Sequence, residues 1–482
     1  MLSKDGQPRQ PQRSVQAPLP SYPRSRGGQI QSLTRRAFLS RAALLTGGAL
    51  SGAAVLQILS TTPAFADPED HRRRGGRSRG GYGPLRPSRD CPELALPEGF
   101  RCRKISVTGA IMSDGNATPP APDGMAAFRL RNGNIRLIRN HEIRTDAASS
   151  RPFGNPALAY DLRGGGGCTS LEIRPRSARD LIRDFVSLNG TTVNCAGGTT
   201  PWGSWLSCEE TTVGPGQGWV REHGYVFEVP AVAEGPVTAA PLRALGRFVH
   251  EAAAVDPESG IVYETEDFDP AGLYRFLPHE PRRLAAGGRL QMLAVRDRPN
   301  YDARIGQMPG RRLPVVWVDI DRPDPPEASG DPQAVYRQGA ARGGAAFRRL
   351  EGAWFSDDSL FVTSTSGGQA GLGQVWEYRP HGHSGGQLRL LFESQSPEAL
   401  DRPDNICVSP RGGILLCEDG PGQNFLRGLT PDGHIFDFAT NLVSDGEFAG
   451  ATFSPDGETL FVNISNPGMT FAIWGDWEEG AL

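Results

Sequence analysis

The sequence predicts an all-β fold, a six-bladed β-propeller, from three observations. The 482 residues include 61 Gly and 41 Pro, with 38% hydrophobic and 8% aromatic residues, a composition typical of many turns and short strands. Pairs of short apolar strands separated by tight polar turns recur along the chain. Ionisable residues occupy equivalent positions in these repeated hairpins. Amphipathic heptads are absent, which argues against a helical bundle or coiled coil. A large β-sandwich is the alternative fold.

The first 66 residues predict an export signal. A twin-arginine motif, TRRAFL at 34–39, precedes an apolar run at 42–59, and AFA at 64–66 fits a small-x-small cleavage site. A single membrane-spanning anchor is the alternative, but glycines interrupt the run and the cleavage sequence follows it. We therefore expect the twin-arginine export machinery as a partner, cleavage after Ala66, no stable membrane anchor, and a periplasmic or secreted protein.

Residues 67–93 are predicted to form a disordered linker, because the segment is rich in Arg and Gly, as in RRRGGRSRGGYG at 72–83. Residues 94–482 then form the propeller domain. The net charge is −3, but residues 1–66 hold 8 basic and 1 acidic residue, which leaves 43 basic and 53 acidic residues in the rest. This acidic body argues against nucleic acid as a partner and is compatible with bound cations. The sequence shows no clear oligomer interface, and we expect a monomer.

Six β-hairpins are predicted along the domain. Five have polar turns between apolar strands, with the turn sequences RNGN (131–134), DPESG (256–260), FSDDS (355–359), SPRGG (409–413) and SPDGE (454–458). The sixth is LNGTTVNCAGGTTPWGSWLSCEE at 188–210. Further apolar segments follow, such as YVFEV (225–229), LYRFL (273–277), VWEY (375–378) and IFDF (435–438). Together they describe six four-stranded blades.

Aligning the hairpins on their turns brings ionisable residues to one end of each hairpin. The first strands begin at Asp123, Cys195, Glu251, Glu351, Asp404 and Ala449. The return strands end at Glu142, Glu209, Glu264, Ser364, Glu418 and Asn463. In a propeller these ends converge around the central channel. Bare carboxylates packed so closely would repel and raise each other's pKa, and bound cations are the natural resolution.

The donor types predict a site with several metal ions in the axial channel. A Cys195 thiolate favours a transition metal, because Ca²⁺ takes oxygen ligands. The surplus carboxylates, Asp123 among them, suit calcium.

Several long motifs resemble the PhoX-type alkaline phosphatases. They are LPEGFRCRKIS (96–106), IMSDGNATPPAPDGMAAF (111–128), RNHE (139–142), NCAGGTTPWGSWLSCEE (194–210), GRFVHEAAAVDP (246–257), RLEGAWF (349–355), PDNICVSPRGGILLCED (403–419) and EFAGATFSPDGETLFVNISNPG (447–468). The resemblance runs from about Leu94 to Trp477. It implies a six-bladed propeller exported by the twin-arginine route, with Fe³⁺ and Ca²⁺ in the channel, that hydrolyses phosphate esters. The chain lacks the long insertions of larger members, so its substrate range stays open.

The resemblance also implies roles for single residues. Cys195, Glu251, Glu351 and Asp404 look like the iron ligands, and Glu142, Glu209 and Glu418 look like calcium or bridging ligands. Asn140 in NHE and Arg349 in RLE look like the phosphate-contacting positions.

The predicted chemistry follows from clustered ions and one guanidinium. Such ions neutralise phosphate oxygens, lower the pKa of bound water and clamp the substrate, so the predicted nucleophile is a metal-held oxide or hydroxide. The planar fork of Arg349 matches phosphate oxygens, and a salt bridge to Glu351 is its alternative role.

Seven cysteines are an odd number for an exported chain. Cys195 is predicted to stay outside any disulfide, and Cys91 with Cys102 is a candidate pair. Cys407 and Cys417 are near but not opposite each other in their hairpin, and we do not expect them to pair.

Other chemistries fit the sequence less well. It has no GxSxG elbow, and His250-Glu251 lacks the second His of a HExxH zinc site. His141 and His250 either contact the site or pack beside it. Two functional alternatives to a phosphatase stay open. One is a calcium-dependent propeller lactonase or esterase, which would leave Cys195 and Arg349 without roles, and the other is a non-enzymatic, calcium-stabilised binding propeller.

Overall fold

A computed structural model describes residues 80–176 and 179–482 of the chain. The predicted export signal, residues 1–66, lies outside the described residues. Among the described residues the structure is almost entirely β, with one α-helix, α4 (Ala334–Ala340). Short 3₁₀ turns lie at Pro156–Leu158, Pro215–Gln217, Arg243–Leu245, Leu284–Ala286, Pro326–Ser329 and Trp477–Glu479. No helix in this part of the chain is long and apolar enough to cross a membrane.

The strands form five hydrogen-bonded sheets. The first contains β4 (Pro122–Arg129), β5 (Ile135–His141), β6 (Gly166–Ile173) and β7 (Leu181–Thr191), and the second contains β8 (Asn194–Thr199), β9 (Ser204–Glu209) and β10 (Val226–Pro230). The third runs through β11 (His250–Val255), β12 (Val262–Glu266), β13 (Leu273–Pro278), β14 (Gly288–Val295), β15 (Arg312–Asp319), β19 (Gly385–Glu393), β18 (Gln374–His381), β17 (Ser359–Ser364) and β16 (Leu350–Ser356). The fourth contains β20 (Pro403–Val408), β21 (Ile414–Glu418), β22 (Phe425–Leu429), β23 (Ile435–Asn441), β2 (Leu94–Leu96) and β1 (Arg86–Pro87). The fifth contains β24 (Phe448–Phe453), β25 (Leu460–Ile464), β26 (Met469–Trp474) and β3 (Arg101–Val107).

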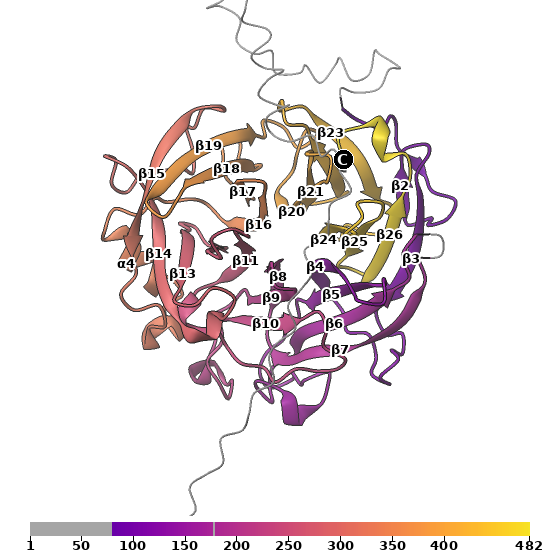
Figure 1. Ribbon diagram of the computed structural model, residues 1–482, viewed down its shortest axis with the longest axis horizontal. Helices are drawn as coiled ribbons and strands as arrows, with labels where there is room; N and C mark the ends of the chain where they lie inside the picture. The colour runs from indigo at the N-terminus through magenta and orange to yellow at the C-terminus, as the bar shows by residue number, and fades with distance from the viewer. Residues whose placement is uncertain (1–79, 177–178) are drawn as a thin grey trace, which may run out of the picture. The chain divides into compact units, whose positions relative to one another are not determined.

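The sheets are arranged as in a propeller, which confirms the all-β prediction. Figure 1 shows them radiating from a centre that is lined by β4, β8, β11, β16, β20 and β24. Each of these inner strands contacts the next, and β24 contacts β4, so the ring of inner strands is closed. The expected six separate four-stranded sheets are not seen, because β15 pairs with both β14 and β19 and joins two sets of strands into one sheet.

All six predicted hairpins are present, as β4–β5, β8–β9, β11–β12, β16–β17, β20–β21 and β24–β25. Their strands are apolar along most of their length because both faces of each sheet are covered. In β21, for example, every residue is buried. Continuous apolar segments between polar turns are typical of buried strands, which explains why the hairpins could be predicted from the sequence.

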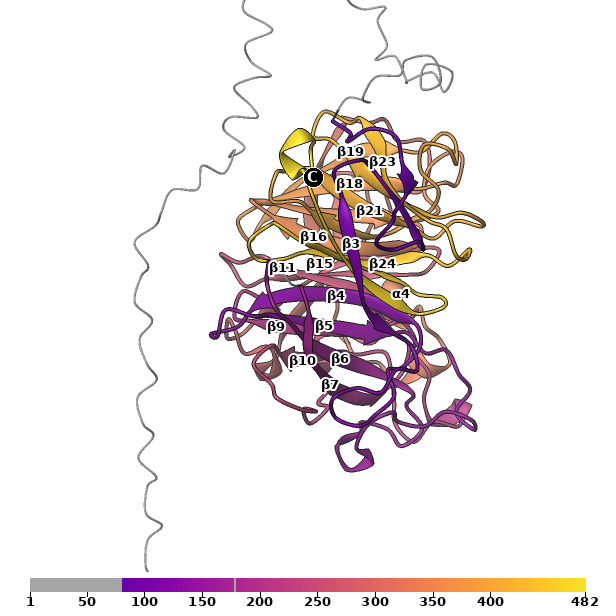
Figure 2. The same cartoon turned by 90° about the vertical axis from the view of Figure 1, so that its right-hand side faces the viewer.

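The third strand of the described chain, β3, shares the fifth sheet with the C-terminal strands. Figure 2 shows β3 beside the C-terminal strands, and β3 pairs antiparallel with β26. The candidate disulfide between Cys91 and Cys102 is present, with a Cα–Cα distance of 6.0 Å. All seven cysteines lie in the described part of the chain, and the other five, including Cys195, are free there.

The predicted linker ends earlier than residue 93, because residues 80–93 pack against the domain. The Tyr82 side chain is buried and makes edge-on ring contacts with Phe100, Phe438 and Trp477. Its hydroxyl donates a hydrogen bond of 2.8 Å to the carbonyl of Leu482. The sequence prediction missed this contact because Tyr82 is one aromatic residue in a segment whose Arg- and Gly-rich composition predicts disorder.

Candidate metal centre and phosphate site

The inner strands all change register where the predicted ligands lie. The register shifts fall at 122–125, 194–197, 250–253, 350–353, 403–406 and 449–452. The first five intervals contain the predicted ligands Asp123, Cys195, Glu251, Glu351 and Asp404. Irregularities of this kind re-aim side chains out of the regular strand alternation, and they are common next to active sites. The sixth interval begins at Ala449, whose methyl group cannot bind a metal ion.

The re-aimed side chains meet in four groups, in each of which the ligand atoms lie within 4.8 Å of one another. The groups are Asp123–Glu142–Cys195, Cys195–Glu210–Glu251, Glu251–Glu351–Asp404 and Asp404–Asp419–Glu447. Each group shares one residue with the next, so the nine side chains form a continuous row, which we call the donor arc. Six of the eight predicted metal ligands belong to the donor arc.

Burial and mutual repulsion disfavour the charged forms of these groups. Burial raises the pKa of Glu251 well above its usual range, and the nearby Glu351 and Asp404 raise it further. Burial, reinforced by Asp419, raises the pKa of Asp404 to about 7. Burial also raises the pKa of the Cys195 thiol, to which nearby carboxylates add. A cation among these side chains would favour the ionised forms and offset the repulsion.

Two of the acids have no hydrogen-bond partner among the described residues. Both carboxylate oxygens of Asp123 and both of Glu251 are buried and unpaired there. A buried polar atom without a partner costs free energy, so such atoms are rare unless something binds them. A set of oxygen donors with one thiolate is suited to metal ions. The residues of the donor arc therefore fit bound metal ions.

Two predicted ligands are not in the donor arc, and three residues that were not predicted are. Glu209 and Glu418 lie outside the four groups, whereas their sequence neighbours Glu210 and Asp419 lie within them, as does Glu447. Successive residues of a strand point to opposite faces. The sequence prediction chose the earlier acid of each pair, because a turn-based alignment does not fix which face a strand-end residue occupies. The adjacent acids in CEE and CED were the signal that could have revealed the alternative.

Glu209 is instead bonded on all sides within the protein. Its carboxylate accepts hydrogen bonds from the backbone N–H groups of Thr192, Gly224 and Tyr225 at 2.8–3.1 Å. His223 lies between Glu209 and Asp161, with Nδ1 2.6 Å from Glu209 and Nε2 3.3 Å from Asp161. Burial alone would lower the pKa of His223, but the two carboxylates overcome it and raise the pKa to about 9. Glu209 therefore holds a buried imidazolium in place.

Glu418 has a comparable structural role. It accepts hydrogen bonds from the backbone N–H groups of Asp401 (2.9 Å) and Phe425 (3.0 Å) and pairs with Arg427 at 2.8 Å. The side chains of Glu418 and Arg427 are both almost fully buried. This ion pair fixes the outer part of the sheet and does not reach the donor arc.

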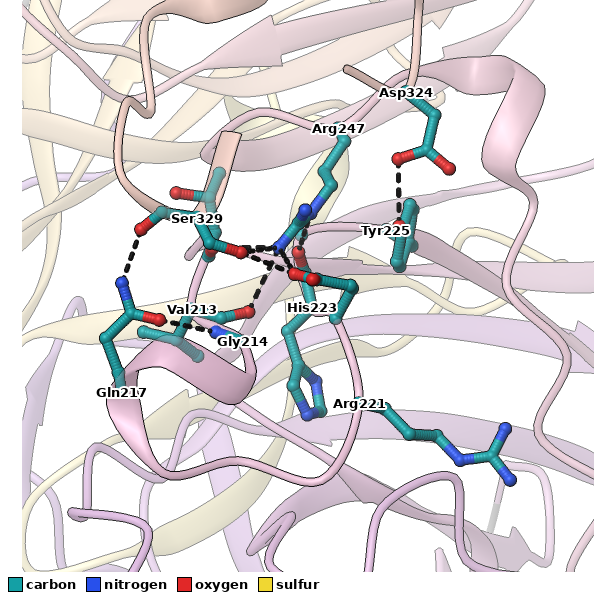
Figure 3. Close-up of polar contacts among 12 residues, drawn as sticks. Val213, Gly214, Gln217, Arg221, His223, Tyr225, Arg247, Asp324 and Ser329 are labelled. Carbon is teal, nitrogen blue, oxygen red and sulfur yellow. Dashed lines mark hydrogen bonds and ion pairs between the residues drawn. The ribbon is translucent and has the colours of Figure 1, made fainter. Parts of the chain in front are cut away.

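The loop that follows Glu210 is held by a second buried cation, Arg247 (Figure 3). The Arg247 guanidinium donates to the carbonyls of His223 (2.7 Å), Thr212 (3.1 Å) and Val213 (3.3 Å) and to the hydroxyl of Ser329 (2.6 Å). Figure 3 also shows Gln217 bridging Gly214 and Ser329. These bonds tie the segment 211–223 to the segment 323–329. They stiffen the loop next to Glu210 and so fix one side of the donor arc.

Arg349, the predicted phosphate-contacting arginine, lies beside Glu351 of the donor arc. Its guanidinium makes two parallel bonds of 2.8 and 2.9 Å to Asp267 and pairs with Glu351 at 2.9 Å. The predicted alternative, a salt bridge to Glu351, is therefore present in the structure. Because 40% of the Arg349 side chain is exposed, the guanidinium faces solvent above the buried Glu351.

Asn140, predicted to contact phosphate, does not reach the donor arc. Its amide is buried and donates to the carbonyls of Cys195 (2.9 Å) and Ala196 (2.7 Å). Its oxygen accepts hydrogen bonds from Cys168, Trp205 and Ser207 at 2.8–3.1 Å. Every polar atom of the amide takes part in these bonds, which hold the backbone that carries Cys195.

The bond from Asn140 is one of four similar braces around the centre. Thr265 donates to the carbonyl of Glu351, Thr363 to that of Asp404 and Asn463 to that of Asp123, each at 2.6 Å. In each case a side chain of one hairpin holds the backbone of a ligand residue in the adjacent hairpin. The braces keep the irregular inner strands in a fixed geometry.

The two histidines left open by the sequence pack beside the site. His141 is buried, with Nδ1 2.9 Å from the Pro120 carbonyl and Nε2 2.9 Å from the Thr169 hydroxyl. His250 is buried against the Phe248 ring, with centroids 3.6 Å apart. Burial lowers the pKa of both. Neither belongs to the four donor groups.

A small cavity lies among the inner strands next to the donor arc. Its volume is about 30 Å³, and its lining includes Trp205, Trp354 and the small residues that follow the ligands. A Cβ on Gly198 would lie 1.6 Å from the Ala253 carbonyl oxygen, which shows how closely the inner strands approach. A cavity of this size holds about one or two waters and no phosphate ester.

The chain was compared with known families and structures. The model of the family described as alkaline phosphatase PhoX matches residues 80–468. The chain belongs to the PhoX family. It is therefore a metal-dependent phosphatase that hydrolyses phosphate monoesters. Family membership decides against the lactonase and the non-enzymatic binding propeller.

One solved structure supports the propeller fold. PhoX of Pseudomonas fluorescens, solved in complex with vanadate, a transition state analogue, matches with a TM-score of 0.62 and 19% identity, over 83% of this chain and 98% of that chain. A gluconolactonase from Xanthomonas campestris matches with a TM-score of 0.39 and 14% identity, over 83% of this chain and 100% of that chain. A search of curated protein sequences found no match.

Proposed function

We propose that this PhoX phosphatase holds Fe³⁺ at the two central groups of the donor arc and Ca²⁺ at the two outer ones. The central groups contain Cys195, Glu210, Glu251, Glu351 and Asp404, and Cys195 brings the thiolate that favours a transition metal. Glu142 with Asp123, and Asp419 with Glu447, supply the oxygen donors that suit calcium. The observation that carries the proposal is the four unpaired oxygens of Asp123 and Glu251, which no described residue satisfies.

The protein's own groups would bind and orient the phosphate ester. When bound, the cations would supply charge neutralisation and an activated oxygen. Arg349 would offer two parallel N–H donors to the phosphate oxygens, in place of the carboxylate of Asp267 that it now holds. The braces from Asn140, Thr265, Thr363 and Asn463 would keep the ligand residues fixed while the substrate binds.

We also propose a domain division and a blade count. The nine-stranded sheet would count as two blades, β11–β14 and β16–β19, bridged by β15, which gives six blades in all. The closed ring of six inner strands supports this count. Residues 1–66 would be a twin-arginine signal cleaved after Ala66, which would deliver an unanchored monomer to the periplasm or beyond. Residues 94–482 would form the propeller, with residues 80–93 packed on it.

Elemental analysis, visible absorption and p-nitrophenyl phosphate hydrolysis test the proposal together. The wild type should contain iron and calcium and absorb visible light, and Cys195→Ala should lose iron, colour and activity. Cys407→Ala is the matched control, because Cys407 is a buried free cysteine in the apolar core and should keep all three. Calcium alone, or iron retained in Cys195→Ala, would overturn the assignment of iron to Cys195.

A further inference from the structure

We infer that Arg144 is a second phosphate-binding residue, which acts with Arg349 from the other side of Glu210; this inference rests on the proposed function. Arg144 follows β5 by three residues and is ion-paired with both Glu142 and Glu210. Those two carboxylates belong to different donor groups that share Cys195. One nitrogen of the Arg144 guanidinium, Nη2, contacts both carboxylates, so the guanidinium lies where the first two donor groups meet.

Arg144 and Arg349 are linked by a short row of carboxylates. Glu210 is ion-paired with Arg144 and interacts with the Asp267 side chain, and Asp267 holds Arg349. The four side chains therefore contact one another in the order Arg144, Glu210, Asp267 and Arg349. Two guanidinium groups flank the same pair of acids, and each also pairs with a further member of the donor arc, Glu142 or Glu351.

Exposure places the guanidinium of Arg144 on the side from which a substrate arrives. The Arg144 side chain is 58% exposed, whereas those of Glu142 and Glu210 are 14% and 7% exposed. Arg144 thus lies over the carboxylates and not beneath them. Any anion that approaches this part of the donor arc from solvent meets Arg144 before it meets the acids.

Metal binding would change what Arg144 pairs with. In the structure Glu142 and Glu210 both pair with the Arg144 guanidinium. Once they hold cations, part of their charge is neutralised, and Arg144 is left with N–H donors that face solvent. A guanidinium forms charge-assisted, often bidentate, hydrogen bonds to phosphate. Because the charge of a transferring phosphoryl group is spread over three oxygens, donors from two sides suit it better than one.

The alternative is that Arg144 serves the apo protein alone, by neutralising Glu142 and Glu210 until metal ions bind. The two roles differ in what the loss of Arg144 changes. A phosphate-binding Arg144 sets the affinity for phosphate at constant metal content. A merely neutralising Arg144 alters metal uptake and leaves the phosphate affinity of the loaded protein unchanged.

The test compares wild type, Arg144→Ala, Arg144→Lys and Arg311→Ala as metal-loaded, full-length proteins. Arg311 is an exposed control that forms no side-chain hydrogen bond or ion pair with any described residue. The measurements are the Kd of inorganic phosphate by calorimetry, the KM for p-nitrophenyl phosphate, and the iron and calcium content. In Arg144→Ala we expect Kd and KM to rise by about 10- to 100-fold with unchanged metal content, because a charge-assisted pair is lost.

Arg144→Lys should recover part of the affinity, and Arg311→Ala should match the wild type. An unchanged phosphate Kd in Arg144→Ala, or a loss of metal with unchanged KM, would overturn the inference. These results are distinct from a failure of the proposed metal assignment. That failure would appear as wild-type protein without iron or calcium, whereas a failure of the Arg144 inference would appear as an unchanged phosphate Kd in a variant that holds its metal ions.

Discussion

Buried acids in this protein have contrasting surroundings, and the contrast bears on which carboxylates hold the fold and which can bind a ligand. Glu209 and Glu418 accept several hydrogen bonds each and pair with His223 and Arg427. Glu251, although equally buried, has two oxygens that no described residue satisfies. Burial alone therefore does not mark a metal ligand. Lack of a partner alone does not mark one either, because both buried oxygens of Glu264 lack a hydrogen bond to any described residue although Glu264 lies outside the donor arc, whereas Asp123 and Glu251 combine unpaired oxygens with a place in the donor groups.

Replacement of an unpaired acid should affect activity more than stability. Glu251→Gln removes the carboxylate shared by two donor groups. We expect kcat/KM for p-nitrophenyl phosphate to fall by at least ~1,000-fold, about 4 kcal/mol of transition-state stabilisation, together with a loss of bound iron. In chelator, the unfolding temperature should stay equal or rise, because repulsion from Glu351 and Asp404 is relieved.

Assays, elemental analysis and thermal unfolding on the same preparations check this. If the unfolding temperature of Glu251→Gln in chelator is far below that of the wild type, and the metal content of the variant is normal, then Glu251 is a structural acid. The contrast between Glu251 and Glu209 would then be wrong.

Replacement of an acid whose oxygens are all hydrogen-bonded within the protein should affect stability more than activity. Glu209→Gln leaves the His223 imidazolium with Asp161 as its remaining carboxylate and turns an amide N–H₂ toward backbone donors. Breaking one side of a buried ion pair costs about 3 kcal/mol. The free energy of unfolding, measured in urea, should fall by about that amount, while the folded protein keeps its metal content. A normal stability with lost metal would return Glu209 to the ligand set.

All five inner-strand candidates lie in the donor arc, whereas of the return-strand candidates Glu142 lies in it and Glu209 and Glu418 do not. Asp123, Cys195, Glu251, Glu351 and Asp404 share one position because all five lie at register shifts of equivalent hairpins. A turn-based alignment carries that position from one repeat to the next. The hairpins themselves could be predicted because their strands are continuous apolar runs between polar turns.

The return strands were harder because their residues alternate between two faces. Glu209 and Glu210 differ by one position, and nothing local shows which one points to the axis. Glu447 precedes its inner strand and has no counterpart in the other repeats, so repetition could not reveal it. The brace role of Asn140 depends on a contact with a different sheet, which a single motif does not encode.

The stability that His223 contributes through its pairing with Glu209 and Asp161 should decrease as the pH rises. The pKa of His223 is raised from about 6.5 to about 9 in the folded protein. A raised pKa contributes stability that is fully present below pH 6.5 and is lost as the pH rises through 9. The shift corresponds to about 3 kcal/mol. Urea unfolding of wild type and His223→Gln in chelator, between pH 6 and pH 10, should therefore show a difference in free energy that shrinks at alkaline pH. A difference that stays constant to pH 10 would mean that His223 is neutral in the folded protein.

Among the replacements expected to lower the free energy of unfolding, that of Asn140 should have the smallest effect. It also tests whether Asn140 contacts phosphate, as its motif implies, or braces the backbone, as its hydrogen bonds indicate. Asn140→Ala removes five hydrogen bonds and leaves buried groups without partners, among them the Trp205 indole N–H and the carbonyl of Cys195. Leaving such groups unpaired should lower the free energy of unfolding by about 2 kcal/mol.

If Asn140 acts as a brace, the folded, metal-loaded variant should bind inorganic phosphate within about two-fold of wild type, because no atom of its amide is free for phosphate. Arg349→Ala should weaken phosphate binding by about ten-fold or more, since it removes a bidentate donor. Calorimetry on both variants separates the two roles. A normal stability with a ten-fold loss of phosphate affinity in Asn140→Ala would mean that Asn140 contacts phosphate and does not act as a brace.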